Sequence, residues 1–462
     1  MSSSLRAYYF CVYLLVLCGC APKSAVGRLL LIGAESRGFT PAFASEEHQS
    51  LTQIQLPTTR NFTNWFTTTS GLVIGTYADV IALAFDYYGP ETLSAVVCPM
   101  GESTTSSLIN FQAAFNSLFE TTDASRLTAA KTLIAGEIAA VATSTPPSAG
   151  LLALSQMRWL SVPTAIIIGV YNLDHFTSQG CAVSAWNVGQ NWALSVAQGV
   201  NPSNPNDGGD LQLAIAISAF ANHLGTDLFS SGHMRTPRIP LVQQCSGSIY
   251  SAGLTAQRMH DEDSTNGLPV ATTSRSGAVD MYMAYGDNYL GDSKSATQRQ
   301  MVLAFLNASI SAVWQTWVGS NSSLIPTVEE LVAMFPQPQD WTANASTPCP
   351  LFHVVNESLS GVFTLETREP LTALYVRPCT FRPFDPTTDC SGADNTFLSA
   401  LSLIFPSTVA YDALAGGFIS YPYSFDVNAG ERTTTCSNPT QLGRALSLGW
   451  LSFLVLVLVM AF

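Results

Sequence analysis

Charged residues are scarce in this chain, and basic residues are the scarcer kind. Only 11% of the 462 residues are charged, and 32 acidic against 19 basic residues give a net charge of −13. A protein that binds nucleic acid through its phosphates needs a basic surface to neutralise them. The composition therefore disfavours nucleic acid as a partner. With 47% hydrophobic residues, it fits a secreted or surface protein with a polar, uncharged exterior.

Several common catalytic and metal-binding patterns are absent from the sequence. It has no G-x-S-x-G nucleophile elbow and no G-x4-G-K-[ST] loop, so serine hydrolases and P-loop enzymes find no support. Ten cysteines occur without a C-x2-C pair, and three of them lie in the N-terminal apolar run. We expect the other seven to form structural disulfides and leave one odd thiol, rather than to bind metal.

The N-terminus predicts export. Arg6 precedes an apolar run that ends at Cys20, which is typical of a signal peptide, here over about residues 1–22. The segment Leu17-Cys18-Gly19-Cys20 also resembles a bacterial lipobox, so a lipoprotein is an alternative. N-glycosylation sequons are compatible with a secreted glycoprotein, and they begin at Asn61, Asn307, Asn321, Asn344 and Asn356.

The C-terminus is a second targeting feature. Residues 445–462 are nearly all apolar and follow a polar stretch, residues 431–443. This is the layout of a GPI-attachment signal. Eighteen residues can also just cross a bilayer, so an uncleaved membrane anchor is the alternative. Either reading predicts a protein of the secretory pathway at the cell surface.

Apolar residues at three-to-four-residue spacing predict a mainly α-helical chain. The candidate helices cover residues 69–87, 104–120, 124–143, 179–199, 210–229 and 297–318. After about residue 320, sequons, prolines and short β-branched or aromatic runs replace this pattern. We expect a helical domain over residues 46–318, then a mixed, disulfide-containing extension of unknown role over residues 320–436.

Two of the chain's six histidines lie close together at the end of one apolar helical run. His223, Asp227 and His233 form the pattern H-x3-D-x5-H. Residues four apart share a helix face, so His223 and Asp227 project together. Gly232 is a predicted helix stop that lets His233 return from the following loop. Two imidazoles and a carboxylate suit a borderline cation such as zinc. The alternative is a His–carboxylate hydrogen bond inside a helical bundle.

Further histidines and acids stand at the ends of apolar segments. His48 precedes one such segment and Asp86 ends another, while His175 follows Asp174. His260 opens the acidic run His260-Asp261-Glu262-Asp263. Asp287, in Tyr285-Gly286-Asp287, is interpreted as a turn residue rather than a ligand.

This ordered set resembles the zinc-dependent phospholipase C and S1/P1 nuclease superfamily. Its hallmark is a helical H-x3-D-x5-H, which His223, Asp227 and His233 match in type and spacing, and the likeness covers roughly residues 46–290. The resemblance implies a multi-helix phospholipase C/P1 nuclease-like bundle with one to three zinc ions. It also implies that Asp227 bridges two ions and that His233 serves a third.

The same resemblance divides the remaining candidate ligands. His48 would serve the bridged pair, and Asp86 with His175 would complete the partner ion. His260 would hold the third ion with His233 and with either Glu262 or Asp263. The family places an acid four residues after this last histidine, where the chain has Ser264.

The resemblance implies a metal-dependent phosphodiesterase that hydrolyses phospholipid head groups at a membrane surface. Asp86 is the expected group to orient or deprotonate the attacking water. Arg235 and Arg238, shortly after His233, are the candidate phosphate contacts. A P1-like nuclease or nucleotidase and a non-catalytic surface protein that retains the fold are the alternatives. The sequence gives no indication of oligomeric state.

Overall fold

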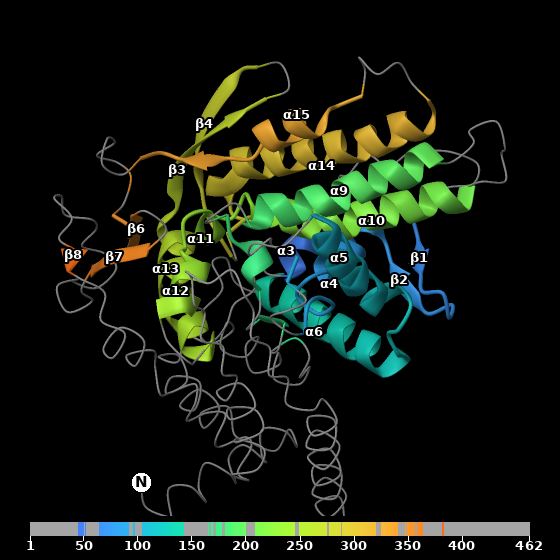
Figure 1. Ribbon diagram of the computed structural model, residues 1–462, viewed down its shortest axis with the longest axis horizontal. Helices are drawn as coiled ribbons and strands as arrows, with labels where there is room; N and C mark the ends of the chain where they lie inside the picture. The colour runs from blue at the N-terminus through green and yellow to red at the C-terminus, as the bar shows by residue number, and fades with distance from the viewer. Residues whose placement is uncertain are drawn as a thin grey trace, which may run out of the picture. The chain divides into compact units, whose positions relative to one another are not determined.

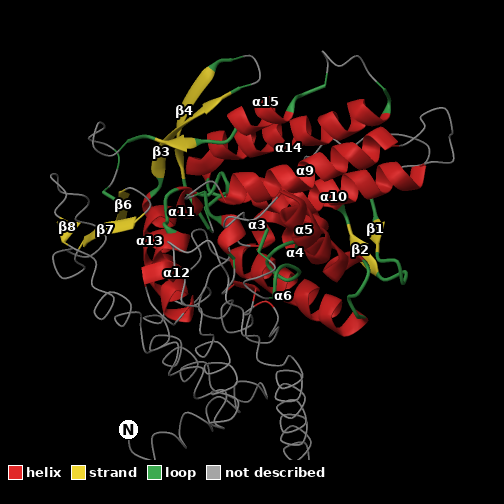
Figure 2. Cartoon of the chain, viewed as in Figure 1, coloured by secondary structure: helices red, strands yellow, loops and turns green. Residues whose placement is uncertain are grey.

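Helices dominate the structure (Figure 2). They account for 64% of the described residues, in eleven α-helices, which confirms the prediction of a mainly α-helical chain. The predicted signal peptide and the apolar tail lie outside the described residues. The computed structural model describes residues 45–49, 51, 64–91, 96–97, 104–142, 165, 168–169, 172–177, 181–199, 208–244, 249–274, 277–287, 289–319, 325–340, 347, 349–355, 358–363 and 381–382.

The chain divides into two compact units. The first contains residues 1–236, 259–350 and 369–378, and the second contains the remainder. Every candidate metal ligand belongs to the first unit. Residues 325–340 also belong to it, although the sequence places them in the extension. Within the part of the chain that is described, no helix has the length and apolarity needed to cross a membrane.

Three long helices lie side by side in the first unit (Figure 1). They are α9 (Cys181–Gly199), α10 (Gly208–Asp227) and α14 (Ala296–Trp317). Every residue from 214 to 230 is buried, so this part of α10 is enclosed by its neighbours on all sides. A helix that is apolar all round is expected in the core. The H-x3-D pair at the end of α10 is therefore held inside the protein.

Other elements pack around these helices. Helix α4 (Tyr77–Leu83) packs on α10, α5 (Thr104–Phe119) packs on α9, and α3 (Ser45–Gln49) packs on α4 and on α6 (Ala124–Ala142). Strands β1 (Phe66–Thr67) and β2 (Val73–Gly75) form a small antiparallel pair. A second antiparallel sheet has the order β4-β3-β5, formed by Val279–Ala284, Leu268–Thr273 and Gln337–Pro338. The first unit also contains η2 (Leu173–His175), α11 (Ser231–Met234), η4 (Ser293–Ser295) and α15 (Val328–Ala333).

The second unit is described by itself. It contains α12 (Arg238–Gln244), the first part of α13 (Ile249–Asn266) and an antiparallel sheet of order β6-β7-β8. These strands are Phe352–Val355, Ser358–Phe363 and Phe381–Arg382. The predicted strand-like run at residues 362–365 overlaps β7, whereas the run at 374–376 lies outside the described residues.

Five of the six predicted helices match α5, α6, α9, α10 and α14 to within two residues at each end. The exception is the first, because α4 spans only residues 77–83 of the predicted 69–87. Thr76 and Asp79 form a capping box that fixes its start. Its end is fixed by Ala84, which is extended, and by Phe85, which has a positive φ of 54°.

Close helix packing gives the first testable prediction. A Cβ atom at Gly189 of α9 would lie 2.3 Å from Phe111 and 2.7 Å from the Ala221 side chain. Gly189→Ala should therefore destabilise the protein by about 1–3 kcal/mol through overpacking, although alanine has the higher helix propensity. Gly199→Ala, at the open end of the same helix, is the matched control. Urea unfolding measures both, and equal stability of the two variants would contradict the packing.

Candidate metal centre

Helix α10 presents His223 and Asp227 on one face. Nε2 of His223 lies 3.3 Å from Oδ2 of Asp227, and neither side chain is exposed. Nδ1 of His223 lies 2.9 Å from the carbonyl oxygen of Ile81 in α4. A carbonyl oxygen only accepts, so Nδ1 donates and the lone pair of Nε2 faces the carboxylate. The structure thus directs a ring nitrogen of His223 toward Asp227, as the spacing predicts.

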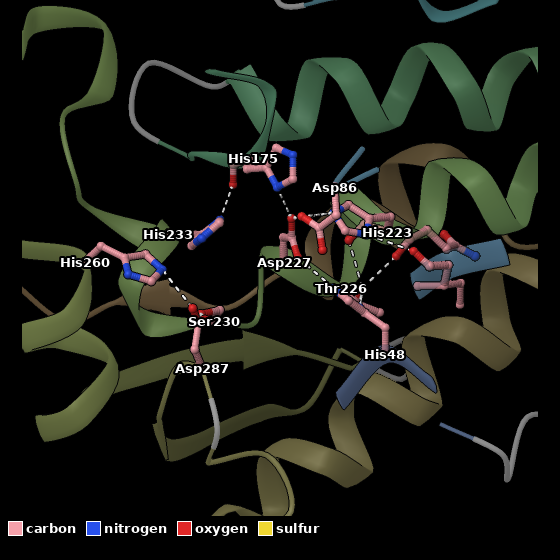
Figure 3. Close-up of polar contacts among 12 residues, drawn as sticks. His48, Asp86, His175, His223, Thr226, Asp227, Ser230, His233, His260 and Asp287 are labelled. Carbon is pink, nitrogen blue, oxygen red and sulfur yellow. Dashed lines mark hydrogen bonds and ion pairs between the residues drawn. The ribbon is translucent and has the colours of Figure 1, made fainter. Parts of the chain in front are cut away.

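Two more histidines reach the same carboxylate from other elements. Nε2 of His48, in α3, lies 3.4 Å from Oδ1 of Asp227. Nδ1 of His175, in η2, lies 2.7 Å from Oδ2. Figure 3 shows the three imidazoles converging on Asp227 from separate parts of the chain. Because Oδ1 and Oδ2 face different histidines, Asp227 has the arrangement expected of a bridging carboxylate.

Asp86 joins this cluster through a tight turn after α4. Its Oδ1 lies 3.8 Å from Nε2 of His223. The residue before it, Phe85, has a φ of 54°, a left-handed conformation that costs energy for a bulky side chain. The turn is closed by a 2.9 Å hydrogen bond from Phe85 N–H to the carbonyl of Tyr88. Phe85 packs against Phe220, and this contact helps to hold the strained turn that presents Asp86.

A second cluster lies beside the first. It contains His233 of α11, His260 of α13 and Asp287, which follows β4 (Figure 3). Nε2 of His260 lies 3.4 Å from Oδ2 of Asp287. Nδ1 of His233 lies 2.8 Å from the carbonyl oxygen of His175 and so donates to it. His175 therefore links the two clusters, through its ring to Asp227 and through its backbone to His233.

These residues form four overlapping groups that could each hold a metal ion. Within each group the ligand atoms lie within 4.8 Å of one another, and every member is buried. The groups are His48–His223–Asp227, Asp86–His175–His223, His175–Asp227–His233 and His233–His260–Asp287. Four residues are shared between groups, so the site is one continuous cluster. A single nitrogen binds one ion, so the four groups represent fewer than four ions.

The donor atoms fit a cation. Among the described residues, Nε2 of His223, both oxygens of Asp227, Nε2 of His260 and Oδ2 of Asp287 are buried without a hydrogen-bond partner. Such atoms are costly to bury unless something satisfies them. Ligating histidines in known metal sites donate their other N–H to a carbonyl or carboxylate. His223 and His233 both do so here, to backbone carbonyls.

The pKa values of these residues also favour the binding of a cation. Burial, aided by the neighbouring His223, lowers the pKa of His48 to about 4. Burial also lowers the pKa values of His223 and His233 well below the usual value. These imidazoles are neutral near pH 7, which is the form that binds metals. Burial raises the pKa of Asp227 to about 6, because its charge is poorly compensated without a cation.

The pKa values in the second cluster are shifted in a different way. Burial alone would lower the pKa of His260, but Asp287, together with Asp261 and Asp263, raises it to about 9. Burial raises the pKa of Asp287 to about 7, against the opposing effect of His260. In the absence of metal, a proton on His260 therefore balances these acids, and a cation would have to displace it.

Asp287 takes the place predicted for other acids. It was expected to be a turn residue, whereas Glu262 and Asp263 were the expected ligands, and neither of these two joins a group among the described residues. The carboxylate of Asp263 instead accepts hydrogen bonds of 2.8 and 2.7 Å from Nε and Nη2 of Arg235. Arg235 thus uses two of its donors on an ion pair, and its phosphate contact stays a prediction.

Two glycines explain how Asp287 reaches the cluster and how His233 is placed. A Cβ atom at Gly286 would lie 2.0 Å from Oγ of Ser264, so the loop before Asp287 passes directly over this small residue. Gly232 does not end a helix as predicted, because α10 ends at Asp227 and Gly232 lies inside α11. A Cβ there would lie 2.6 Å from the His260 ring, so Gly232 permits close contact with α13.

Thr226 is a further site residue that sequence reasoning missed. Its Oγ1 lies 3.0 Å from Nδ1 of His48. Its position between His223 and Asp227, inside an apolar helix, is the only sequence signal that could have drawn attention to it. The sequence indicates the role of Asp287 even less clearly, since that role depends on a hairpin that was not predicted.

Comparisons with known proteins add no family: no family model, curated protein or solved structure matches this chain.

The presence of Asp287, rather than Glu262 or Asp263, in the second cluster gives a prediction about metal content. Asp287→Asn should reduce the number of bound metal ions by one, because it removes a carboxylate from the group with His233 and His260. Asp263→Asn is the matched control on α13, and it should keep the ions while losing stability, because it breaks the ion pair with Arg235. Metal analysis of both purified variants measures this. Loss of an ion in Asp263→Asn alone would show that the acids are assigned the wrong way round.

The raised pKa of His260 gives a prediction about pH. Its folded value of about 9 exceeds the unfolded value of 6.5, so the native state keeps a proton that the unfolded chain loses. This stabilisation is complete below pH 6.5 and is lost as the pH rises to about 9. The thermal midpoint of chelator-treated protein should fall over this range. His260→Gln loses this contribution and keeps only that of Asp287, whose pKa is also raised, so its pH profile should differ from that of the wild type. Identical pH profiles for the two proteins would contradict the assignment.

Proposed function

We propose that the chain is a zinc-dependent phosphodiesterase with a phospholipase C/P1 nuclease-like helical bundle, and that it hydrolyses phospholipid head groups. The observation that carries the proposal is the buried cluster around Asp227, in which separate segments place histidine nitrogens around one carboxylate. The set contains histidine and aspartate only, and zinc accepts both.

Some residues of the cluster would bind metal ions, and Asp86 would also accept a proton. His48, His223, Asp227, His175 and Asp86 would hold a pair of ions. The second cluster would hold a third through His233, His260 and Asp287. When bound, divalent ions supply Lewis-acid stabilisation of the negative charge that develops on a phosphodiester under attack by water.

Asp86 is the proposed group that orients the attacking water. It lies at the edge of the first cluster, 3.8 Å from His223, farther than the carboxylate of Asp227. Its side chain is 3% exposed, whereas that of Asp227 is fully buried. A carboxylate in this position could accept a proton from water as the phosphorus–oxygen bond forms.

The proposed substrate agrees with the proposed location of the protein in the cell. A signal peptide, glycosylation and a GPI or other C-terminal anchor would place the enzyme on the outer surface of a membrane, where phospholipid is abundant. The net charge of −13 disfavours the P1-like nuclease alternative. A non-catalytic protein that retains the fold is the other alternative, and it would bind no more than one structural ion.

The test combines metal content with two substrates. His223→Ala should lose at least one zinc ion and reduce hydrolysis of phosphatidylcholine vesicles by about two orders of magnitude or more, because His223 belongs to two groups. His353→Ala, on β6 of the second unit, is the matched histidine control and should keep both properties.

Each outcome separates the candidates. Hydrolysis of single-stranded nucleic acid in place of phosphatidylcholine would favour the nuclease. Unchanged metal content and activity in His223→Ala would refute the metal-dependent assignment altogether.

A further inference from the structure

The hydroxyl of Thr226 makes three short contacts inside the core. Its Oγ1 lies 3.0 Å from Nδ1 of His48 and 2.8 Å from each of the carbonyl oxygens of Asn222 and His223. Thr226 and His48 are both fully buried. Thr226 therefore connects α10, which carries two candidate ligands, to a third ligand on the short helix α3.

Proton counting fixes the direction of these hydrogen bonds. The hydroxyl has one proton, and the two carbonyl oxygens can only accept it. Threonine in a helix commonly donates to a carbonyl three or four residues earlier. Oγ1 of Thr226 is then left with lone pairs toward His48, so Nδ1 of His48 donates. In a neutral imidazole Nε2 must then carry the lone pair, and it lies 3.4 Å from Oδ1 of Asp227.

His48 thus follows the same rule as His223 and His233, with one difference. Those two donate Nδ1–H to backbone carbonyls, of Ile81 and His175. His48 donates to a side chain, which a substitution can remove without altering the backbone.

We propose that Thr226 is a positioning residue that fixes the tautomer and ring orientation of His48, so that Nε2 becomes its metal-binding nitrogen in the group with His223 and Asp227. The inference rests on the proposed zinc centre for its effect on metal binding. Its effect on the imidazole is independent of metal. Partners of this kind change metal affinity by about 10- to 100-fold when removed.

The metal experiment compares three variants by zinc titration. Thr226→Val removes the hydroxyl at nearly constant volume and should lower the affinity for one zinc ion by about 10- to 100-fold. Thr226→Ser keeps the hydroxyl and should retain the affinity. Thr236→Val is the matched control, because buried Thr236 also donates to the carbonyl four residues earlier, Gly232, at 2.7 Å. Equal zinc affinities in wild type and Thr226→Val would overturn the proposal.

Nitrogen NMR of histidine-labelled, metal-free protein reads the tautomer directly. His48 should carry its proton on Nδ1 in wild type and Thr226→Ser, and shift toward the Nε2–H form in Thr226→Val. An Nε2–H tautomer in the wild type would overturn the proposal even if the valine variant does not fold. An Nδ1–H tautomer in a protein that binds no zinc would support the role of Thr226 and refute the proposed function instead.

Discussion

The carboxylate of Asp227 is buried at the end of an enclosed helix with three histidines within 3.4 Å. A charge in this position is unfavourable unless opposite charge and hydrogen bonds compensate it. His48 and His223 do not supply that charge, because burial lowers their pKa values. A divalent cation between the carboxylate and the imidazole nitrogens would compensate this charge, and the buried cluster could hold one.

That arrangement depends on contacts made outside the cluster. Backbone carbonyls of Ile81 and His175 hold the rings of His223 and His233. Thr226 does the same for His48. The ion pair between Arg235 and Asp263 ties the segment after His233 to α13, which carries His260. These supports come from helices, loops and a hairpin, so the site is preorganised by the tertiary structure rather than by any single motif.

The sequence predicted the features that depend on residues close together in the chain. Helix α10 and the shared face of His223 and Asp227 follow from apolar spacing, and so do four other helices. Helix α13 was missed, although Ala252, Ala256 and Met259 are buried at helical spacing, because the acidic run after His260 resembles a solvated loop.

The remaining features depend on contacts between segments distant in sequence. Asp287 reaches His260 only because Gly286 lets its loop pass over Ser264, and no local pattern encodes that approach. Gly232 was interpreted through its common role at helix ends, whereas here close packing against His260 requires it.

Native mass spectrometry of the purified full chain, before and after chelation and after zinc is restored, measures how many ions the cluster holds. We expect two or three zinc ions per chain, which chelation removes and added zinc restores. A chain that stays folded and binds no zinc, or only one ion, would contradict this expectation.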